Sequence, residues 1–463
     1  MNWRRISRSM ANVNRLRFTR ARFSTGGTGS ERAANPPMVI PHATNHPPKD
    51  IISRRRFVSG SLAAAGALST CSWRVDGAQP AARAKLPVAG VTTVYYDNSH
   101  ADVILGKILE GFAHDGGAGP DLRLVSLYTD QRPENDLSRG LAQKHGFRLA
   151  DTIDEAVTLG TGRLAVAGVV IVGEHGHYPE TSDTRQIMYP RRRFFDETVA
   201  SFRRVKQVAP VFSDKHLGYS WADAQHIYDT ARALSIPLMA GSSLPVTWRT
   251  PSVAPRLGCE FDEVLALGYG PLEGYAFHAL EMSQCMAERR QGGETGVASV
   301  ETVQGPAIWE AQRAGLWSRA LFDAALARVP PYGQGKPEEL MNADAAFYLI
   351  KYRDGLKATL AMANGVTDQF VFSAAVKGAS EPLVIWFRTQ DVEPFGHFAY
   401  LLRAIDDMVH SGRPSYPVER TLLTTGVLDA ALHSLAAGHK PLPTPQLDVR
   451  YAPVDWPFAP GTP

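Results

Sequence analysis

Histidine and carboxylate side chains gather in one short polar stretch near the middle of the chain. The sequence "GEHGHYP" places Glu174, His175, His177 and Tyr178 directly after an apolar run, and His216 follows a later apolar run. Imidazole and carboxylate groups can transfer protons, bind the hydroxyl groups of a ligand, or coordinate zinc, iron or manganese. These residues are therefore candidates for one site, in which acid–base or ligand-binding roles are favoured over a metal ion.

The elements that would position these side chains alternate between apolar strands and amphipathic helices. Runs at 122–130 and 169–172 predict buried strands, whereas 191–205 and 220–236 predict helices. Buried strands that alternate with helices indicate a parallel, doubly wound sheet, and we predict a Rossmann-like domain over residues 85–247. Ligands of such sheets bind at the carboxyl ends of the strands, so the loops that carry the candidate residues should share one crevice.

The sequence pattern changes after Trp248. A helix is predicted at 274–290, and two alternating strands joined at Asp354-Gly355 predict a hairpin. Another apolar strand and two amphipathic helices follow. Strands and helices that are separated in this way indicate an α+β domain with a largely antiparallel sheet over residues 248–463.

The turn after the first predicted strand, residues 97–100 with the sequence "DNSH", contains no glycine. A dinucleotide-binding turn uses glycines so that backbone N–H groups approach the pyrophosphate closely. Here Asn98, Ser99 and His100 would obstruct that approach, but they can cap a helix that begins near Asp102 and keeps its positive end. The sequence therefore predicts that any bound dinucleotide is held by this helix terminus and by polar side chains.

Asp130 ends the second predicted strand, where an acidic side chain can accept a hydrogen bond from a ribose 2′-hydroxyl. An aspartate at this position is also a common turn residue. The sequence leaves both interpretations open, and with them the choice between NAD and NADP.

The stretch "VFSDKHLGYSWADAQHIYDTARALSIPLMAG" resembles the Gfo/Idh/MocA oxidoreductase family, which includes glucose–fructose oxidoreductase and inositol dehydrogenase. Two further stretches, "LAQKHGFRLADTIDEAV" and "TGVLDAALHSLAAGHKPLP", resemble other parts of that family, so the resemblance covers residues 88–447. It implies hydride transfer between NAD or NADP and a sugar, a cyclitol or a related polyol. It also implies a homo-oligomer, because family members often pair through the open face of the second domain's sheet. The alternative is a divergent relative that binds carbohydrate, with or without a metal, and performs no nicotinamide chemistry.

The resemblance also assigns roles to individual residues. The family carries a Glu-Lys-Pro loop, which here reads "DKH" around Lys215, and a motif D-x-G-x-H-x-x-D, of which "EGYAFHALE" keeps His278 and Glu281. The first aspartate of the motif is missing, and Glu273, one residue earlier, would substitute for it. The implied chemistry makes His278 the general base for a hydroxyl, while Lys215 polarises the oxygen.

The predicted site thus has three sets of residues. The catalytic set is Lys215, His278 and Glu273. The predicted cofactor contacts are Asn98, Ser99, His100, Asp130, Glu174 and His175. The predicted substrate contacts are His177, Tyr178, His216 and Glu281. A lysine after a strand is otherwise a solvated loop residue, and a histidine on an apolar helix face is otherwise a core histidine.

Composition excludes several classes of protein. Residues 1–56 hold twelve basic and two acidic residues, so their net charge is +10. The whole chain has a net charge of +3, so the remaining residues together carry −7. A mildly acidic body argues against a nucleic-acid partner, which needs a basic face. Three cysteines without a CxxC pair cannot build a disulfide framework and disfavour cysteine-bound zinc.

The N-terminal stretch has the layout of an export signal. The sequence "SRRRF" at 53–57 matches the twin-arginine pattern S-R-R-x-F, and a weakly apolar, Ala/Gly-rich stretch follows it. We therefore predict that residues 1–84 are a disordered basic leader that the twin-arginine machinery recognises, which sends the protein to the periplasm or cell envelope. Ala82-Arg83-Ala84 offers a small-x-small cleavage site, and the alternative is a lipid anchor at Cys71, which a lipobox-like stretch precedes.

Overall fold

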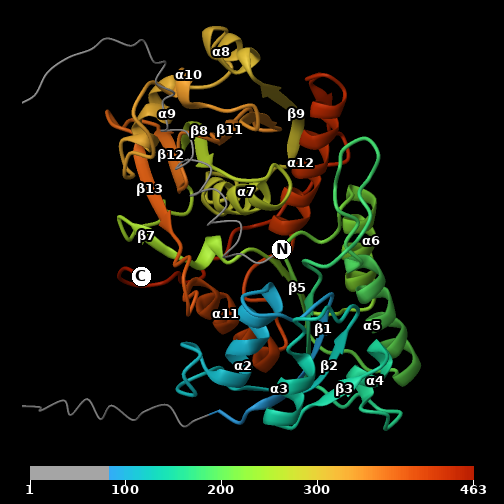
Figure 1. Ribbon diagram of the computed structural model, residues 1–463. Coiled ribbons are helices and arrows are strands. Elements are labelled where there is room, and N and C mark those ends of the chain that lie inside the picture. Colours follow the sequence, from blue (N-terminus) through green and yellow to red (C-terminus); the bar gives the residue numbers. More distant parts are fainter. Residues whose placement is uncertain (1–82) are drawn as a thin grey trace, which may run out of the picture. The chain divides into compact units, whose positions relative to one another are not determined.

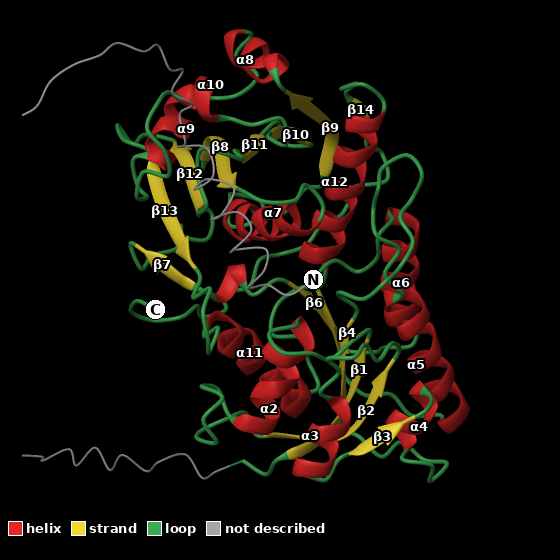
Figure 2. Cartoon of the chain, in the orientation of Figure 1, coloured by secondary structure: helices red, strands yellow, loops and turns green. Residues whose placement is uncertain are grey.

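A computed structural model describes residues 83–463, so the twin-arginine motif and Cys71 lie outside the described residues. The first layer is a six-stranded parallel sheet in the order β3-β2-β1-β4-β5-β6 (Figures 1 and 2). Its strands are β1 (Leu86–Thr92), β2 (Leu122–Thr129), β3 (Arg148–Ala150), β4 (Gly168–Val172), β5 (Val211–Asp214) and β6 (Leu238–Gly241). The sequence order reverses between β1 and β4, which is the switch point at which such sheets open a crevice.

Helices connect these strands, and their ends follow local capping chemistry. They are η1 (Asp102–Gly106), α2 (Lys107–Glu110), α3 (Ser138–His145), α4 (Ile153–Thr158), α5 (Arg191–Val205) and α6 (Trp221–Ala233). The Thr152 and Ser220 hydroxyls accept backbone N–H groups at the starts of α4 and α6. Gly146 ends α3 with φ 71°, a conformation that favours glycine. The predicted helices of this layer are confirmed.

Both faces of the parallel sheet are buried. Val169 and Ile171 of β4 belong to the core cluster that contains residues of α4, α5 and α6, whereas Val170 and Val172 belong to the cluster around η1. Successive strand side chains point to opposite faces, so both sets must be apolar, and this explains the continuous apolar runs. The predicted doubly wound fold is confirmed.

The second layer is an eight-stranded sheet in the order β14-β9-β10-β11-β8-β12-β13-β7. Its strands are β7 (Trp248–Thr250), β8 (Phe261–Gly268), β9 (Val297–Gln304), β10 (Ala346–Tyr352), β11 (Lys357–Met362), β12 (Phe370–Val376), β13 (Leu383–Arg388) and β14 (Leu442–Pro443). Only the pairing of β8 with β11 is parallel. The largely antiparallel sheet and the β10–β11 hairpin at Asp354-Gly355 are confirmed.

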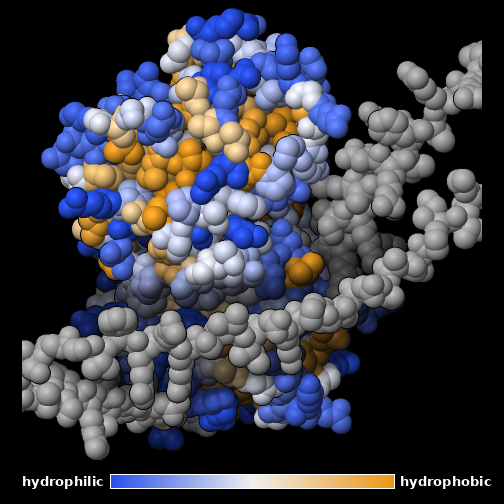
Figure 3. All heavy atoms as spheres, turned by 90° about the vertical axis from the view of Figure 1, so that its left-hand side faces the viewer, coloured by the Kyte–Doolittle hydropathy of each residue, from blue (hydrophilic) through white to orange (hydrophobic). Residues whose placement is uncertain are grey.

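Helices cover both faces of this second sheet. The helices after β7 are α7 (Gly274–Ala287), α8 (Pro306–Arg313), α9 (Arg319–Leu326), α10 (Pro337–Leu340), α11 (His397–Ser411) and α12 (Glu419–Ala436). On one face α7 packs beside α12, and on the other Trp317 and Phe322 pack against Leu265 and Leu267 of β8. The resemblance predicts an open face on this sheet, whereas helices of this chain pack against both of its faces. Apolar side chains still gather on the upper part of the surface in Figure 3, and the homo-oligomer stays a prediction.

One helix crosses from the second half of the chain to the first layer. Leu401, Ile405 and Met408 of α11 share a buried cluster with Val88 of β1 and Ile104 of η1, and α11 lies beside α2 in Figure 1. This packing places the start of α11 at the carboxyl edge of the parallel sheet.

No helix among residues 83–463 combines the length and the apolar character that a membrane span requires.

Candidate active site

The carboxyl edge of the parallel sheet brings several of the predicted residues together. His100 follows β1, Glu174 and His175 follow β4, and Lys215 follows β5. Helix α7, which lies between the two sheets, adds His278 from the other side (Figure 2). The loops that carry these residues lie together, as predicted, because the carboxyl ends of parallel strands meet at one edge of the sheet.

The closest contact in this group joins Lys215 to His278. The Lys215 Nζ lies 2.6 Å from the His278 Nε2, and the His278 Nδ1 lies 2.6 Å from the Ser242 Oγ. An ammonium group only donates hydrogen bonds, so Nε2 must be the acceptor and the ring proton sits on Nδ1. Burial, together with the nearby charge of Lys215, holds the pKa of His278 well below its ordinary value. His278 is therefore a neutral base whose orientation Ser242 fixes.

Lys215 and Arg191 share the carboxylate of Glu174. The Arg191 Nη2 lies 2.6 Å from Glu174 Oε2, and Lys215 Nζ lies 3.6 Å from Glu174 Oε1. Burial opposes ionisation of Glu174, but the charges of Lys215 and Arg191 outweigh it and hold the pKa of this carboxyl well below its usual range. Glu174 is an anion at neutral pH that keeps the two cations in the protein interior.

Sequence reasoning missed Arg191. Three consecutive arginines open α5, and no local signal distinguishes the first of them. The side chain of Arg191 is fully buried because Gly173 leaves room for it, since a Cβ at Gly173 would lie 2.6 Å from Arg191 Cγ. Arg191 Nη1 also lies 3.1 Å from the His216 Nε2, which holds His216 in this ionic group.

Glu273 lies at the other end of this ionic group. Its two carboxylate oxygens accept the Ile187 backbone N–H at 3.1 and 3.2 Å, and Oε1 is 4.0 Å from the His216 Nε2. Burial raises the pKa of Glu273 to about 7, and the negative charge of Glu174 adds to the rise. Glu273 can therefore exchange a proton near neutral pH.

His100 occupies the centre of the crevice. Its Nδ1 lies 2.6 Å from Asp214 Oδ2, and its ring centroid lies 5.4 Å from that of His175 and 6.4 Å from that of His278. His175 is held neutral, because burial lowers its pKa to about 3. The three imidazoles thus lie face to edge or stacked across the switch point of the sheet.

A cavity opens beside His100 and His278, towards the second sheet. Aromatic rings of Tyr269, Tyr275 and Phe370 form its wall. About 40 Å³ of this cavity is open to the centre of a water molecule, enough for a few waters in the described conformation. Phe370 lies about 100 residues after Tyr269 and Tyr275, and no local pattern could have joined it to them.

The glycine-free turn before η1 is filled by its own polar side chains. The Ser99 Oγ accepts the backbone N–H groups of Tyr96 and Asp102, and Asp102 Oδ2 accepts the Asn98 N–H at 2.9 Å. Asn98 takes the left-handed conformation with φ 62°. Burial raises the pKa of the Asp102 carboxyl to about 6. The helix end that would face a pyrophosphate is therefore capped by Ser99 and flanked by a carboxyl group.

Asp130 is engaged by three donors from the chain itself. The Tyr128 and Tyr178 hydroxyls each donate at 2.7 Å, and the Arg193 Nη2 lies 2.5 Å from Oδ1. His177, the next candidate residue, is exposed, and its backbone pairs with the side chain of Gln131. Tyr178 and His177 therefore lie with Asp130, away from the cavity.

Glu281 also lies outside the cavity, behind His278. It is fully buried, and its carboxylate accepts the Thr421 and Thr424 hydroxyls and the Ser242 N–H. These contacts tie α7 to α12 and to the end of β6. Burial raises the pKa of Glu281.

The described crevice does not fit a dinucleotide. A pyrophosphate would meet the Asp102 carboxyl and the side chains of Asn98 and Ser99, and a ribose would have to displace Arg193 from Asp130.

Within residues 83–463, no group of three or more His, Cys, Asp or Glu residues has a geometry that could hold a metal ion.

No family model matches this sequence, and no curated protein matches it. Among solved structures, GenD2 from gentamicin A biosynthesis in complex with NAD is similar, with a TM-score of 0.48 and 15% identity over 78% of this chain and 97% of that one. The scyllo-inositol dehydrogenase from Lactobacillus casei, with bound NAD(H) and scyllo-inositol, has a TM-score of 0.46 and 10% identity over 78% and 99%. Biliverdin reductase from Synechocystis, in complex with biliverdin and NADP+, has a TM-score of 0.44 and 14% identity over 76% and 99%.

Proposed function

We propose that this chain is a divergent member of the Gfo/Idh/MocA family that acts on a hydroxyl group of a sugar, a cyclitol or a related polyol. The observation that carries the proposal is the 2.6 Å contact between Lys215 and His278, with His278 in the wall of the aromatic cavity. Both residues belong to the motifs that resemble the family, and they come from opposite layers of the fold.

Lys215 and His278 together can remove the proton of a substrate hydroxyl. A hydroxyl that enters between the two side chains takes the place of their direct contact, so Lys215 donates to its oxygen and His278 Nε2 accepts its proton. The Ser242 Oγ keeps Nδ1 in place while the ring becomes a cation. Glu174 lies 3.6 Å from Lys215 and holds the ammonium in position throughout.

The walls of the cavity suit a carbohydrate. The rings of Tyr275 and Phe370 lie 6.4 Å apart at 25°, and Tyr269 lies 4.9 Å from Phe370. Aromatic faces offer apolar area with fixed geometry, and the polar side chains of Asn98 and His278 at the cavity supply hydrogen bonds. A ring with both C–H and O–H groups matches that combination.

NAD or NADP is the hydride acceptor that the family resemblance implies. Binding it in the usual place requires the turn at 97–102 and the loop at 174–178 to rearrange, because their side chains occupy the crevice. This observation favours a second candidate function, in which the chain binds or transforms a carbohydrate without nicotinamide chemistry.

The first experiment looks for the cofactor. Protein from its native cells is denatured, and the supernatant is measured for nicotinamide by absorbance and mass. Nicotinamide at one equivalent supports the oxidoreductase. The purified protein is then titrated with NAD and NADP by calorimetry and screened against sugars and cyclitols by thermal shift.

The outcomes separate the two candidates. Sugar-induced stabilisation without nicotinamide binding supports the second function and contradicts hydride transfer. The His278→Asn variant should lose turnover on any substrate found, by about 10²-fold or more, while it still binds that substrate. No response to any sugar or dinucleotide would sink both candidates.

We also propose that the chain is exported through the twin-arginine route to the periplasm or cell envelope, on the strength of the 53–57 motif and the apolar stretch behind it. Replacing Arg54 and Arg55 by Lys should leave the precursor in the cytoplasm, as cell fractionation would show. Mass analysis of the mature N-terminus distinguishes cleavage from a lipid on Cys71. Unchanged export of the double variant would exclude this route.

A further inference from the structure

A second cavity, separate from the first, is lined by three arginines. Arg249 comes from β7, Arg289 follows α7, and Arg420 belongs to α12. Tyr416, Cys285 and Asp455 also belong to the wall. About 20 Å³ is open to the centre of a water molecule, which is room for one or two particles of that size.

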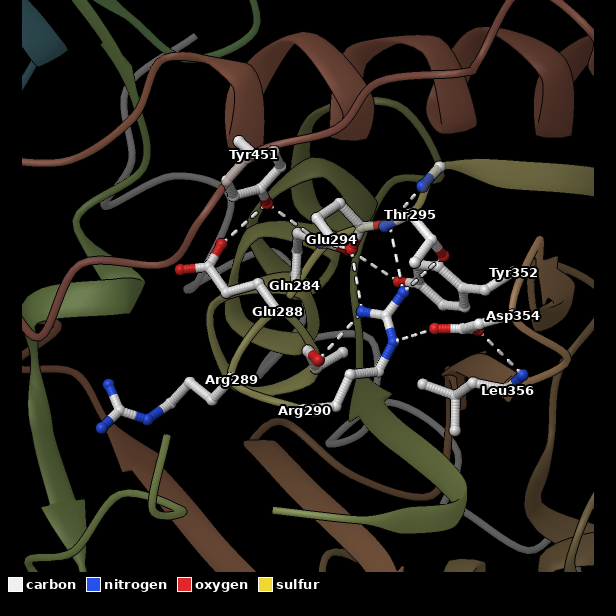
Figure 4. A network of polar contacts seen from close by, with 12 residues as sticks. Gln284, Glu288, Arg289, Arg290, Glu294, Thr295, Tyr352, Asp354, Leu356 and Tyr451 are labelled. Atoms are coloured by element: carbon white, nitrogen blue, oxygen red, sulfur yellow. Dashed lines mark hydrogen bonds and ion pairs between the residues drawn. The ribbon is translucent and has the colours of Figure 1, made fainter. Parts of the chain in front are cut away.

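Two of these arginines have carboxylate partners. The Arg420 Nε lies 2.9 Å from Glu288 Oε2, which also accepts the Tyr451 hydroxyl at 2.7 Å. Arg289 Nη2 lies 2.8 Å from Asp455 Oδ1. Figure 4 shows the pair of Glu288 and Tyr451, and it shows Arg289 pointing away from the rest of that network.

Arg249 has no carboxylate partner among the described residues. Its side chain is 5% exposed, its Nη2 donates to the Pro245 carbonyl at 2.7 Å, and its Nε has no hydrogen-bond partner. The guanidinium lies between the rings of Phe387 and Phe458, 5.0 and 3.9 Å from their centroids. The buried Tyr416 hydroxyl on the same cavity also lacks a partner within residues 83–463.

Asp455 is the one carboxylate among the lining residues, and it pairs with Arg289 rather than with Arg249. Burial raises the pKa of the Cys285 thiol to about 11, so this group is neutral at pH 7. Burial lowers the pKa of Arg249 to about 10, which still leaves it charged. A buried charge and a buried hydroxyl without partners are both costly, so a ligand that satisfies both would stabilise the fold.

We propose that this cavity binds a single small inorganic anion of the size of chloride, held by the Arg249 guanidinium and the Tyr416 hydroxyl. The fields of Arg289 and Arg420 add to its attraction. Its room for one or two water-sized particles fits an ion of this size. No residue lines both this cavity and the cavity beside His278.

The anion has a structural consequence. Phe458 and Asp455, which contact Arg249 and Arg289, belong to the C-terminal segment, and the Ala459 N–H donates to the Val246 carbonyl of η2 (Leu244–Val246) at 3.0 Å. Leu244 lines the first cavity. A filled anion site thus fastens the C-terminal segment to the turn that borders the candidate active site.

The test compares chloride with gluconate at equal ionic strength on the full chain. The melting temperature should rise by about 2–4 °C as sodium chloride replaces sodium gluconate. The rise should vanish in Arg249→Met, which keeps the volume without the charge. It should persist in Arg256→Met, which changes an exposed arginine seven residues later in the sequence. Tyr416→Phe should need a several-fold higher chloride concentration for the same rise.

Crystals soaked in bromide give a second readout on the unaltered protein. An anomalous peak between Arg249 and Tyr416 is expected. An equal melting temperature in both salts, an unchanged chloride response in Arg249→Met, or the absence of that peak would each overturn the proposal.

Discussion

The Lys215 Nζ lies 2.6 Å from the His278 Nε2, and this contact joins the end of β5 to helix α7. Lys215 takes a left-handed conformation with φ 68°, and its backbone N–H donates to the Gly241 carbonyl at 3.2 Å. A loop held in this way aims the side chain into the space between the two layers. The contact therefore depends on both layers being in place.

Replacing Lys215 by Met should destabilise the fold. Glu174 would lose one of its two cations while it stays buried, and the free energy of unfolding should fall by about 3 kcal/mol. Urea unfolding measures this change. Lys351→Met, an exposed lysine on β10, is the control and should change it by no more than about 0.5 kcal/mol. Equal losses in the two variants would contradict the role of Lys215.

His278 should stay neutral throughout the physiological range. Burial and the charge of Lys215 both lower its pKa, so its ring should carry one proton, on Nδ1, across that range. Nitrogen-15 NMR of labelled protein reports both the protonation state and the tautomer. In Lys215→Met the pKa of His278 should rise, because the positive charge that helps to lower it is gone. Titration of His278 within that pH range in the unaltered protein would refute this prediction.

Glu273 should make stability depend on pH. Its pKa is about 7 in the folded protein against 4.5 for an ordinary glutamate, so the folded state binds the proton more tightly than the unfolded state. The stabilisation that comes from protonated Glu273 is therefore complete below about pH 4.5, and it is lost as the pH rises to 7. Compared with Glu273→Gln, the unaltered protein should lose about 3 kcal/mol of unfolding free energy across that window. Parallel pH profiles of the two proteins would contradict this.

Gly241 should tolerate no side chain. Its φ is 124°, and a Cβ would collide with the carboxylate of Glu281 and lie 2.8 Å from Thr421 Oγ1. Gly241→Ala should destabilise the protein by more than about 2 kcal/mol, measured by urea unfolding. Gly140→Ala, inside α3 with open space around it, should instead stabilise it by about 0.5–1 kcal/mol. A neutral Gly241→Ala would show that Glu281 can move.

Local patterns predicted the elements of this fold well. The apolar runs at 122–130 and 169–172 and the helical spacing at 191–205 and 220–236 are short-range features whose physics acts within a few residues. They were enough to predict a parallel sheet followed by an antiparallel one. The packing of α11 on the first sheet was not predicted, because it depends on contacts between residues about 300 positions apart.

The sequence by itself determined the two-layer fold, and it placed Lys215, Glu174 and His100 at one edge of the parallel sheet, because all three follow strands that end there. Only the tertiary structure decided what these side chains do. It buried Arg191 beside Glu174 and filled the glycine-free turn with Ser99 and Asp102. It also paired the Asp130 carboxylate with Tyr178 and Arg193. Among the described residues it left Arg249 without a carboxylate partner. The physical reason is range: periodicity and capping act along the chain, whereas the partner of a buried charge is set by whichever distant side chain the packing brings within a few ångströms.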